Sequence, residues 1–302
     1  IGDVMELRDE NRILVKSGLE LMAHTRNIGL RALIQVTGTD PAHIKPYTIG
    51  FILGPCLNAT GRLDTAVNAL ALFQTVDVDK AAALAGDLKA MNDSRKDLTA
   101  RGVEEAIEQI ENTGMGKDKV LVVYLPDVHE SLAGIIAGRI REKYYKPVFV
   151  LTRAEEGVKG SGRSIEAFHM YDEMTKCKEL FTKYGGHKLA AGLSLPEENV
   201  EIFRQKLNEN CHLTDEDFEE KVLIDVPMPM AYASFHFIAE LEKLEPFGNG
   251  NPKPQFAQKN VQFISGKLLG VNHNVGKYTV ADEEGRRYEL IYFGDIEAFH
   301  TY

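Results

Sequence analysis

The order of apolar and polar residues predicts that the first third of the chain is helical. Over residues 10–22 the apolar positions have the spacing of an amphipathic helix. One face of this helix carries Leu14, Val15, Leu19 and Met22. Residues 44–115 continue as helices, although Pro46 and Pro55 break the first part. The apolar positions of residues 79–110 predict one long helix, which would act as a stiff spacer between two globular parts.

Strands and helices alternate over residues 118–212. Apolar runs of strand length predict buried strands at 120–124 and 147–151, and a further strand is expected at 189–195. Helical spacing is found at 132–143, 171–184 and 197–208. The glycine-rich stretch 160–165 is typical of a strand or a turn. This alternation predicts a layered α/β domain.

Residues 222–302 differ in character, because prolines and short strands replace the helices. We expect strands at 261–264, 277–281 and 288–293, with a hairpin turn at 282–285. Short strands separated by turns are typical of a small β-barrel. The predicted fold class is therefore multidomain, α/β plus β, with a helical linker between the parts.

Composition restricts the classes of function. The net charge of −10 argues against a protein that binds nucleic acid through bulk positive charge, but it permits a local phosphate groove. The three cysteines lie far apart with no CxxC spacing, which argues against zinc and fits a reducing cytoplasm. No apolar run approaches the length of a membrane span. The chain starts at Ile1 rather than Met, and we expect both ends to be cuts within a longer protein.

The first candidate site is the stretch Gly160, Ser161, Gly162, Arg163 and Ser164. Two glycines allow the backbone to approach a ligand, and their amides can point at an anion. An arginine fork fits a phosphate at two points, and the serines add hydroxyl donors. From the residues alone, a phosphate site and a solvated turn are equally supported.

The second candidate is the stretch Gly185, Gly186, His187 and Lys188. A glycine pair before a histidine places the imidazole on a tight, exposed bend, where it can donate to a phosphate or carry a proton. The lysine adds positive charge. The same glycines are also compatible with a helix C-cap that uses a left-handed residue.

Three weaker candidates stand elsewhere. His129 follows a buried strand at the start of a helix, where anions bind, although Ser131 could be only the N-cap there. Asn58 and Arg62 are one helical turn apart and could face one groove, but the residues alone favour a helix start with a surface arginine. Asp3 is a single carboxylate, whereas a two-metal phosphodiesterase needs several converging ligands.

Together these stretches resemble the RecJ family of single-stranded-DNA exonucleases, which belongs to the DHH phosphoesterase superfamily. The resemblance covers almost the whole chain in order, through Asp3 with 4–12, and through 58–63, 128–139, 160–168, 185–192 and 244–252. Asn-Ala-Thr-Gly-Arg at 58–62 and Glu-Pro-Phe-Gly at 245–248 indicate RecJ in particular. Cys56 departs from the arginine usual in the family, and the aspartate-rich and Asp-His-His motifs would lie before residue 1.

The resemblance implies four parts: the end of a DHH domain at 1–43, a helical connector at 44–116, a DHH-associated α/β domain at 117–213 and an OB-type barrel at 222–302. It also implies hydrolysis of single-stranded DNA from the 5′ end with Mn²⁺ or Mg²⁺. Asp3 would be one metal ligand and His187 would hold the scissile phosphate. The residues that would bind the 5′ phosphate or neighbouring backbone are Asn58, Arg62, His129, Ser161, Gly162, Arg163, Ser164, Gly185, Gly186 and Lys188.

Further implications concern partners and alternatives. A monomer, a single-strand-binding protein and a helicase fit the family. We expect weak binding and very poor cleavage of single-stranded DNA by this chain alone, because the other metal motifs are missing. Two alternatives remain: a DHH phosphodiesterase acting on short RNA oligomers or cyclic dinucleotides, and a non-catalytic relative that only grips DNA.

Overall fold

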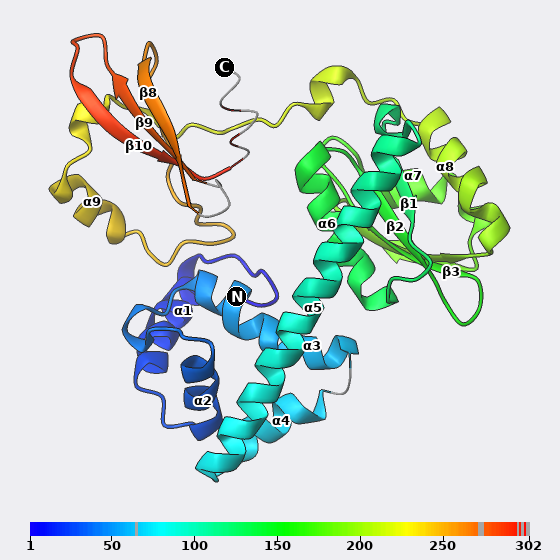
Figure 1. The fold of residues 1–302 in the computed structure, drawn as a ribbon, viewed down its shortest axis with the longest axis horizontal. Coiled ribbons are helices and arrows are strands. Elements are labelled where there is room, and N and C mark those ends of the chain that lie inside the picture. The colour runs from blue at the N-terminus through cyan, green and yellow to red at the C-terminus, as the bar shows by residue number, and fades with distance from the viewer. Residues whose placement is uncertain (64–65, 271–274, 295, 297–298, 300–302) are drawn as a thin grey trace. The chain divides into compact units, whose positions relative to one another are not determined.

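The computed structural model describes the chain except residues 64–65, 271–274, 295, 297–298 and 300–302, and describes only the backbone of 60–63 (Figure 1). The chain divides into two compact units. The first unit contains residues 1–2 and 17–221, and the second contains residues 3–16 and 222–302. Helix α1 (Asp9–Ala23) begins in the second unit and ends in the first.

The first unit starts with a helical part, as the sequence predicts. It consists of the end of α1 followed by α2 (Ile28–Val36), α3 (Gly54–Leu63), α4 (Val67–Gln74) and α5 (Val78–Asn112). A π-helical turn, Thr48–Leu53, leads directly into α3, and Gly54 N–H donates to Ile49 O. Pro55 then lies in the first turn of α3, where a missing N–H costs little. The predicted break at Pro55 is therefore a change of helix type.

Helix α5 confirms the prediction of one long helix over residues 79–110. Asp77 caps its start by accepting from the amides of Asp79 and Lys80, and Gly114 with φ +73° follows its end. The buried residues are mostly small or polar: Ala81, Ala85, Leu88, Asn92, Thr99, Gly102, Ala106 and Ile110. Small residues let other helices approach closely. A Cβ at Gly102 would lie 2.6 Å from Ile136 Cδ1.

Helix α5 therefore packs against both the helical part and the α/β part of the first unit, and it is not a free spacer between them. It packs against α2, α3 and α4, and also against α6 (Ala133–Tyr144) and β1 (Leu121–Tyr124). One apolar core lies among the helices of the first part. A second lies between α5, α6 and the sheet. This packing fixes the helical part to the α/β part.

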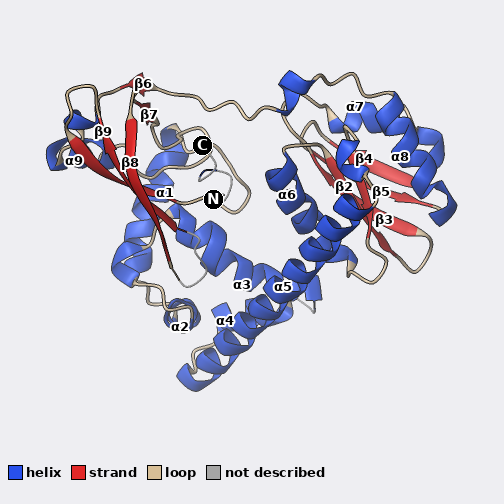
Figure 2. Cartoon of the chain, turned by 45° about the horizontal axis from the view of Figure 1, so that its top comes forward, coloured by secondary structure: helices blue, strands red, loops and turns tan. Residues whose placement is uncertain are grey.

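The α/β part is built on a five-stranded sheet in the order β1-β2-β3-β5-β4 (Figure 2). Its remaining strands are β2 (Val148–Arg153), β3 (Val158–Arg163), β4 (Lys183–Gly186) and β5 (Ala190–Leu195). Strands β1 and β2 are parallel and joined through α6, and the other pairs are antiparallel. These strands confirm the predicted runs at 120–124, 147–151, 160–165 and 189–195 to within a few residues.

The two faces of this sheet are covered differently. One face packs on an apolar core beneath α7 (Met170–Thr175) and α8 (Val200–Glu209), which includes Phe149, Leu193 and Phe203. On the other face α6 packs against β2 and β3. We call the part of that second face over β3, β5 and β4 the open face, because a groove described below runs along it.

The helix predicted at 171–184 is wrong beyond its first turns. Helix α7 ends at Thr175, a 3₁₀ turn follows at Lys178–Leu180, and Lys183–Gly186 form strand β4. Tyr184 and its neighbours pair with β5 along the sheet edge, so tertiary pairing decides the structure of a segment whose apolar spacing suits a helix. The helix predicted at 132–143 is confirmed as α6, and that at 197–208 as a 3₁₀ turn followed by α8.

The second unit contains an antiparallel sheet in the order β10-β9-β8, a short parallel pair β6–β7, and helix α9 (Phe235–Glu242). Its strands are β6 (Val226–Pro227), β7 (Phe256–Ala257), β8 (Gln262–Leu269), β9 (Val275–Ala281) and β10 (Arg287–Tyr292). The hairpin turn predicted at 282–285 is confirmed, because Gly285 has φ +77° and donates to Asp282 O. All three predicted strands are present here.

Residues 3–16 belong to the second unit because they dock on its loop 244–252. Leu7 N–H donates to Asn249 O at 2.7 Å, and the Asn249 side chain donates to Val4 O at 2.7 Å. Arg12 donates to two backbone carbonyls of the same loop region, Lys243 O and Glu245 O. The segment that carries Asp3 is thus held by the C-terminal part of the chain.

Candidate nucleic-acid interface

The register of β3, β5 and β4 arranges the open face into three rows. Residues directly opposite each other in paired strands share a face of the sheet. The lysine row consists of Lys159, Ser194 and Lys183. The glycine row consists of Ser161, Gly192 and Gly185. The arginine row consists of Arg163 and Ala190, with His187 beside them because its N–H donates to Ala190 O at 2.8 Å.

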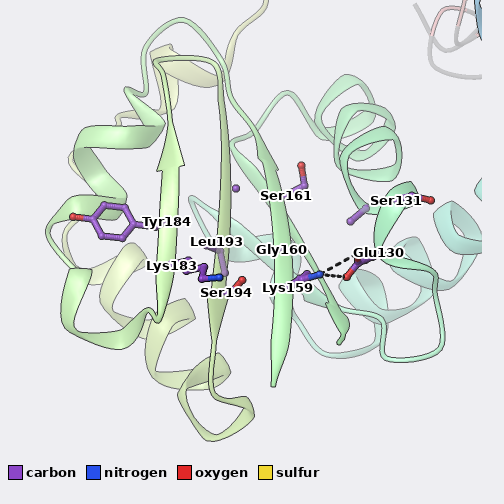
Figure 3. Close-up of a pocket in the computed structure, with 11 residues that line it drawn as sticks. Glu130, Ser131, Lys159, Gly160, Ser161, Lys183, Tyr184, Leu193 and Ser194 are labelled. Atoms are coloured by element: carbon purple, nitrogen blue, oxygen red, sulfur yellow. Dashed lines mark hydrogen bonds and ion pairs between the residues drawn. The ribbon is translucent and has the colours of Figure 1, made fainter. Parts of the chain in front are cut away.

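A groove of about 380 Å³ runs over the lysine and glycine rows (Figure 3). Its walls include Ser131 and Ala133, at the start of α6. Its floor is open at Gly192, where a Cβ would meet only Gly160 O, at 3.9 Å. A side chain would fit the fold there, but it would fill part of the groove. Gly185, opposite Gly192 on β4, is equally open, since a Cβ there would meet nothing within 4 Å.

The groove continues into a larger cavity of about 1010 Å³ beyond the lysine row. The two cavities share Glu130, Lys159, Lys183 and Ser194. Carboxylates line the larger cavity, namely Glu155, Glu156, Glu197 and Glu198, together with Arg153. In the groove itself the positive charge comes from Lys159 and Lys183 of the lysine row, in a chain whose net charge is −10. This is the local groove that the sequence permitted.

Arg163 is half-buried and held by its neighbours at one end of the rows. Its Nη1 donates to Gly162 O at 2.7 Å and to Ser161 Oγ at 3.3 Å. Gly134, in the first turn of α6, makes room for it, since a Cβ there would lie 2.9 Å from both Arg163 Nη2 and Ser161 Oγ. The guanidinium is thus positioned before any ligand arrives, at the positive end of a helix.

His187 lies on the exposed bend that its sequence predicts. Its Nδ1 accepts from Leu189 N–H at 3.3 Å, which leaves Nε2 free of that contact. Gly186 has φ +155°, and a Cβ there would lie 2.5 Å from Ala190 O, so only glycine suits the bend. The predicted helix C-cap is wrong, because Gly185 and Gly186 end a strand. His187 and Arg163 flank Ala190, so the structure brings the two together.

Two expectations for the stretch 160–164 need correction. Strand β3 pairs with β2 and β5, so its backbone amides donate hydrogen bonds to these strands and are not available to bind an anion. Gly162 instead makes room for packing, since a Cβ would lie 2.5 Å from Met170 Sδ. Ser164 is buried, and its hydroxyl donates to Phe168 O at 2.7 Å. The side chain of Ser164 is therefore unavailable to a phosphate.

The loop before α6 carries His129 at the edge of the larger cavity. His129 is exposed and caps the 3₁₀ turn Glu130–Leu132, and its Nδ1 lies 2.7 Å from Ser131 Oγ. The N-cap predicted at Ser131 is therefore wrong, because the N-cap of α6 is Leu132 and that of the 3₁₀ turn is His129. Lys188, on the bend after β4, is exposed and paired with Glu166 at 2.6 Å.

The remaining candidates belong to elements other than β3, β4 and β5. Asn58 is exposed near the middle of α3, not at its start, and α3 contacts the turn Glu130–Leu132. The side chain of Arg62 lies outside the described residues. Asp3 is exposed, and no group of three or more histidine, cysteine, aspartate or glutamate residues that could hold a metal exists in the described part of the chain.

The sequence does not predict the roles of three groove residues, namely Lys159, Lys183 and Glu130, or that of Gly134 beside Arg163. One signal was available. Lys159, Ser161 and Arg163 alternate with two glycines, which is the period-2 pattern of a strand with one polar face. Lys183 could not be found in this way, because its segment has the apolar spacing of a helix.

Comparisons with known proteins identify the family. The model of the RecJ OB domain matches residues 224–302, and the model of the DHHA1 domain matches residues 117–213. The chain is 34% identical over 290 residues to the single-stranded-DNA-specific exonuclease RecJ of Bacillus subtilis, and 33% identical over 284 residues to that of Escherichia coli. These matches cover 95% and 90% of this chain. The chain belongs to the RecJ family.

The likeness to RecJ extends to the fold. The chain aligns with the crystal structure of RecJ in complex with Mn²⁺ from Thermus thermophilus with a TM-score of 0.81 and 28% identity, over 98% of this chain and 43% of that one. It spans 37% of the length of the Bacillus subtilis RecJ and 49% of the Escherichia coli one. The predicted fold class, with a helical part, a DHH-associated α/β domain and an OB domain, is confirmed. In the described residues no helix is long and apolar enough to span a membrane.

Proposed function

We propose that this chain is the part of a single-stranded-DNA-specific exonuclease that binds the DNA strand. The enzyme hydrolyses DNA from the 5′ end to mononucleotides during repair and recombination. The observation that carries the proposal is the open face. It combines a half-buried arginine, a serine and an exposed histidine at one end of a groove floored by glycines. A sugar–phosphate chain is narrow, anionic and repetitive, so rows of short donors over a flat floor suit it.

Each residue in and beside the arginine row has a proposed role in binding the strand. Arg163 binds the 5′-terminal phosphate, with its guanidinium held in place by Gly162 O, and Ser161 binds the adjacent backbone of the strand. His187 donates to the scissile phosphate from the bend after β4 and stabilises the charge that develops there. Gly185 and Gly192 let the backbone of the strand approach the sheet. His129, Lys188 and Asn58 lie on neighbouring exposed segments and contribute to the outer surface of the site.

The metal requirement is proposed by similarity. RecJ structures from Thermus thermophilus contain Mn²⁺ or Mg²⁺, and we propose the same ions for this protein, with Asp3 as one oxygen ligand. One exposed carboxylate does not make a two-metal site, and the described residues supply no further cluster. The metal-dependent step therefore requires ligands beyond the residues described, and we expect this chain alone to cleave DNA very poorly.

The decisive experiment compares the affinity of the chain for 5′-phosphorylated and 5′-hydroxyl single strands of the same sequence. Arg163→Ala should weaken binding of the phosphorylated strand by about 10- to 100-fold, because hydrogen bonds to charged groups contribute about 1.5–3 kcal/mol. The hydroxyl strand should lose less. The control is Arg31→Ala, which removes an exposed arginine on α2. Equal losses on both strands would remove Arg163 from the end-binding role.

The alternatives are less well supported. A phosphodiesterase of short RNA oligomers or cyclic dinucleotides has no evident use for the OB domain matched at 224–302. A non-catalytic gripping relative is distinguished by a nuclease assay with Mn²⁺ on a longer protein that includes the remaining metal motifs.

The proposal extends to compartment and partners. All three cysteines are buried with free thiols, and burial raises the pKa of each, which suits a reducing cytoplasm. We propose a monomer that works beside a single-strand-binding protein and a helicase, which would supply the strand.

A further inference from the structure

We propose that the lysine row is a separate phosphate subsite, so that the open face grips three successive phosphates of one strand. This inference rests on the proposed function and extends it to residues outside the glycine-flanked motifs. The new residues are Lys159 and Lys183, with Ser194 between them. Figure 3 shows the three at one level of the groove, with Ser161 farther along it.

The spacing of the rows carries the argument. A strand rises about 3.3 Å per residue, so rows two residues apart along β3 are separated by about 6.6 Å, and the arginine and lysine rows by about 13 Å. The distance between successive phosphates of an extended single strand is similar to this two-residue repeat of a β-strand. A phosphate at Arg163, a second at Ser161 and a third at the lysine row therefore lie in register with the sheet.

The chemistry of the row agrees with this spacing. Two lysines on β3 and β4 flank the hydroxyl of Ser194 on β5, so a phosphate there meets two ammonium groups and a hydroxyl donor. Beyond this row the larger cavity is lined by four further glutamates and by Arg153, so its lining is net negative and would repel a further phosphate. The positively charged part of the open face therefore ends at the lysine row, and we expect the bound segment of the strand to contain three phosphates.

Glu130 competes for one of these lysines. Its carboxylate contacts Lys159 Nζ at 2.7 Å through Oε2 and at 3.0 Å through Oε1, and both side chains are about half exposed. An ion pair at this exposure contributes at most about 1 kcal/mol, so a bound phosphate can exchange with it. Glu130 therefore holds Lys159 while the groove is empty and lowers the affinity for the strand.

The test measures binding of thymidine 5′-monophosphate and of a 5′-phosphorylated thymidylate tetranucleotide to the chain by NMR titration. The mononucleotide reaches the arginine row alone, whereas the tetranucleotide reaches all three rows. Lys159→Ala and Lys183→Ala should each weaken tetranucleotide binding about two- to fivefold and leave mononucleotide binding unchanged. Each should also reduce the slope of log affinity against log salt by about 0.7. Glu130→Gln should strengthen tetranucleotide binding about two- to fivefold.

Matched controls come from an ion pair on the other side of the sheet. Lys206→Ala and Glu179→Gln each remove one member of the exposed pair Lys206–Glu179 and should leave both affinities unchanged. If Arg163→Ala weakens binding but neither groove lysine does, or if Glu130→Gln weakens it, the lysine row is not a subsite and the proposed function stands. If the unchanged chain fails to bind the tetranucleotide at all, both proposals are overturned.

Discussion

Replacement of Gly192 by alanine should make the protein more stable and a poorer ligand for single-stranded DNA. Gly192 lies inside β5 with its position open to the groove, and an added Cβ would touch only Gly160 O at 3.9 Å. Glycine in a strand costs about 0.5–1 kcal/mol relative to alanine through backbone entropy. Without a clash, Gly192→Ala should therefore raise the free energy of unfolding by about that amount.

The effect on binding has the opposite sign. The new methyl group would stand on the groove floor between Ser161 and Gly185, where the middle phosphate is proposed to lie. Loss of one hydrogen bond to this phosphate, about 1 kcal/mol, corresponds to about fivefold weaker binding. Urea denaturation measures the first effect and fluorescence anisotropy with a labelled oligothymidylate measures the second.

A neighbouring glycine provides the contrast. A Cβ at Gly160 would lie 2.3 Å from Leu151 Cδ2 and 3.2 Å from Leu193 Cδ1, on the apolar face of the same sheet. Gly160→Ala should therefore destabilise the protein by about 1–3 kcal/mol through overpacking. The reasoning is refuted if Gly192→Ala destabilises the fold, or if it stabilises the fold while the affinity stays the same.

Two further predictions concern residues away from the groove floor. Ser164→Ala should lower the free energy of unfolding by about 0.5–1.5 kcal/mol, measured in urea, with DNA affinity unchanged, because the Ser164 hydroxyl serves only Phe168 O; a loss of affinity at unchanged stability would contradict this. Burial alone would raise the pKa of Asp282, but hydrogen bonds from the Arg286 amide and guanidinium and from Tyr288 outweigh burial and hold it below its ordinary value. Its contribution to stability should therefore be full above about pH 3.9, the usual value for an unfolded aspartate, and be lost as the pH falls through the folded value. In urea titrations the stability difference between the protein and Asp282→Asn should shrink in acid, and a difference independent of pH would show that the carboxylate makes no such contribution.

The sequence was sufficient for elements whose pattern is local. The long helix α5 follows from apolar spacing over many turns, and the turn at 282–285 follows from its glycine and acidic residues. The stretch 171–184 failed because its apolar spacing suits a helix, while Tyr184 and its neighbours form an edge strand only through pairing with β5. Pairing partners are a tertiary property that a single segment does not encode.

The candidate site shows the same division. Arg163 and His187 were found because glycines precede them in the sequence, and the structure places both beside Ala190. Lys159 and Lys183 were missed because their meaning depends on register across three strands. Ser164 was assigned wrongly because a side chain at a strand end can turn into the core, as its bond to Phe168 shows.

The most direct measurement is a crystal structure of this chain with a short 5′-phosphorylated oligonucleotide. The account predicts the sugar–phosphate chain on the open face, with successive phosphates beside Arg163, Ser161 and the Lys159–Lys183 pair, and Glu130 released from Lys159. A strand bound elsewhere on the first unit, with the glycine-floored groove empty, would contradict it.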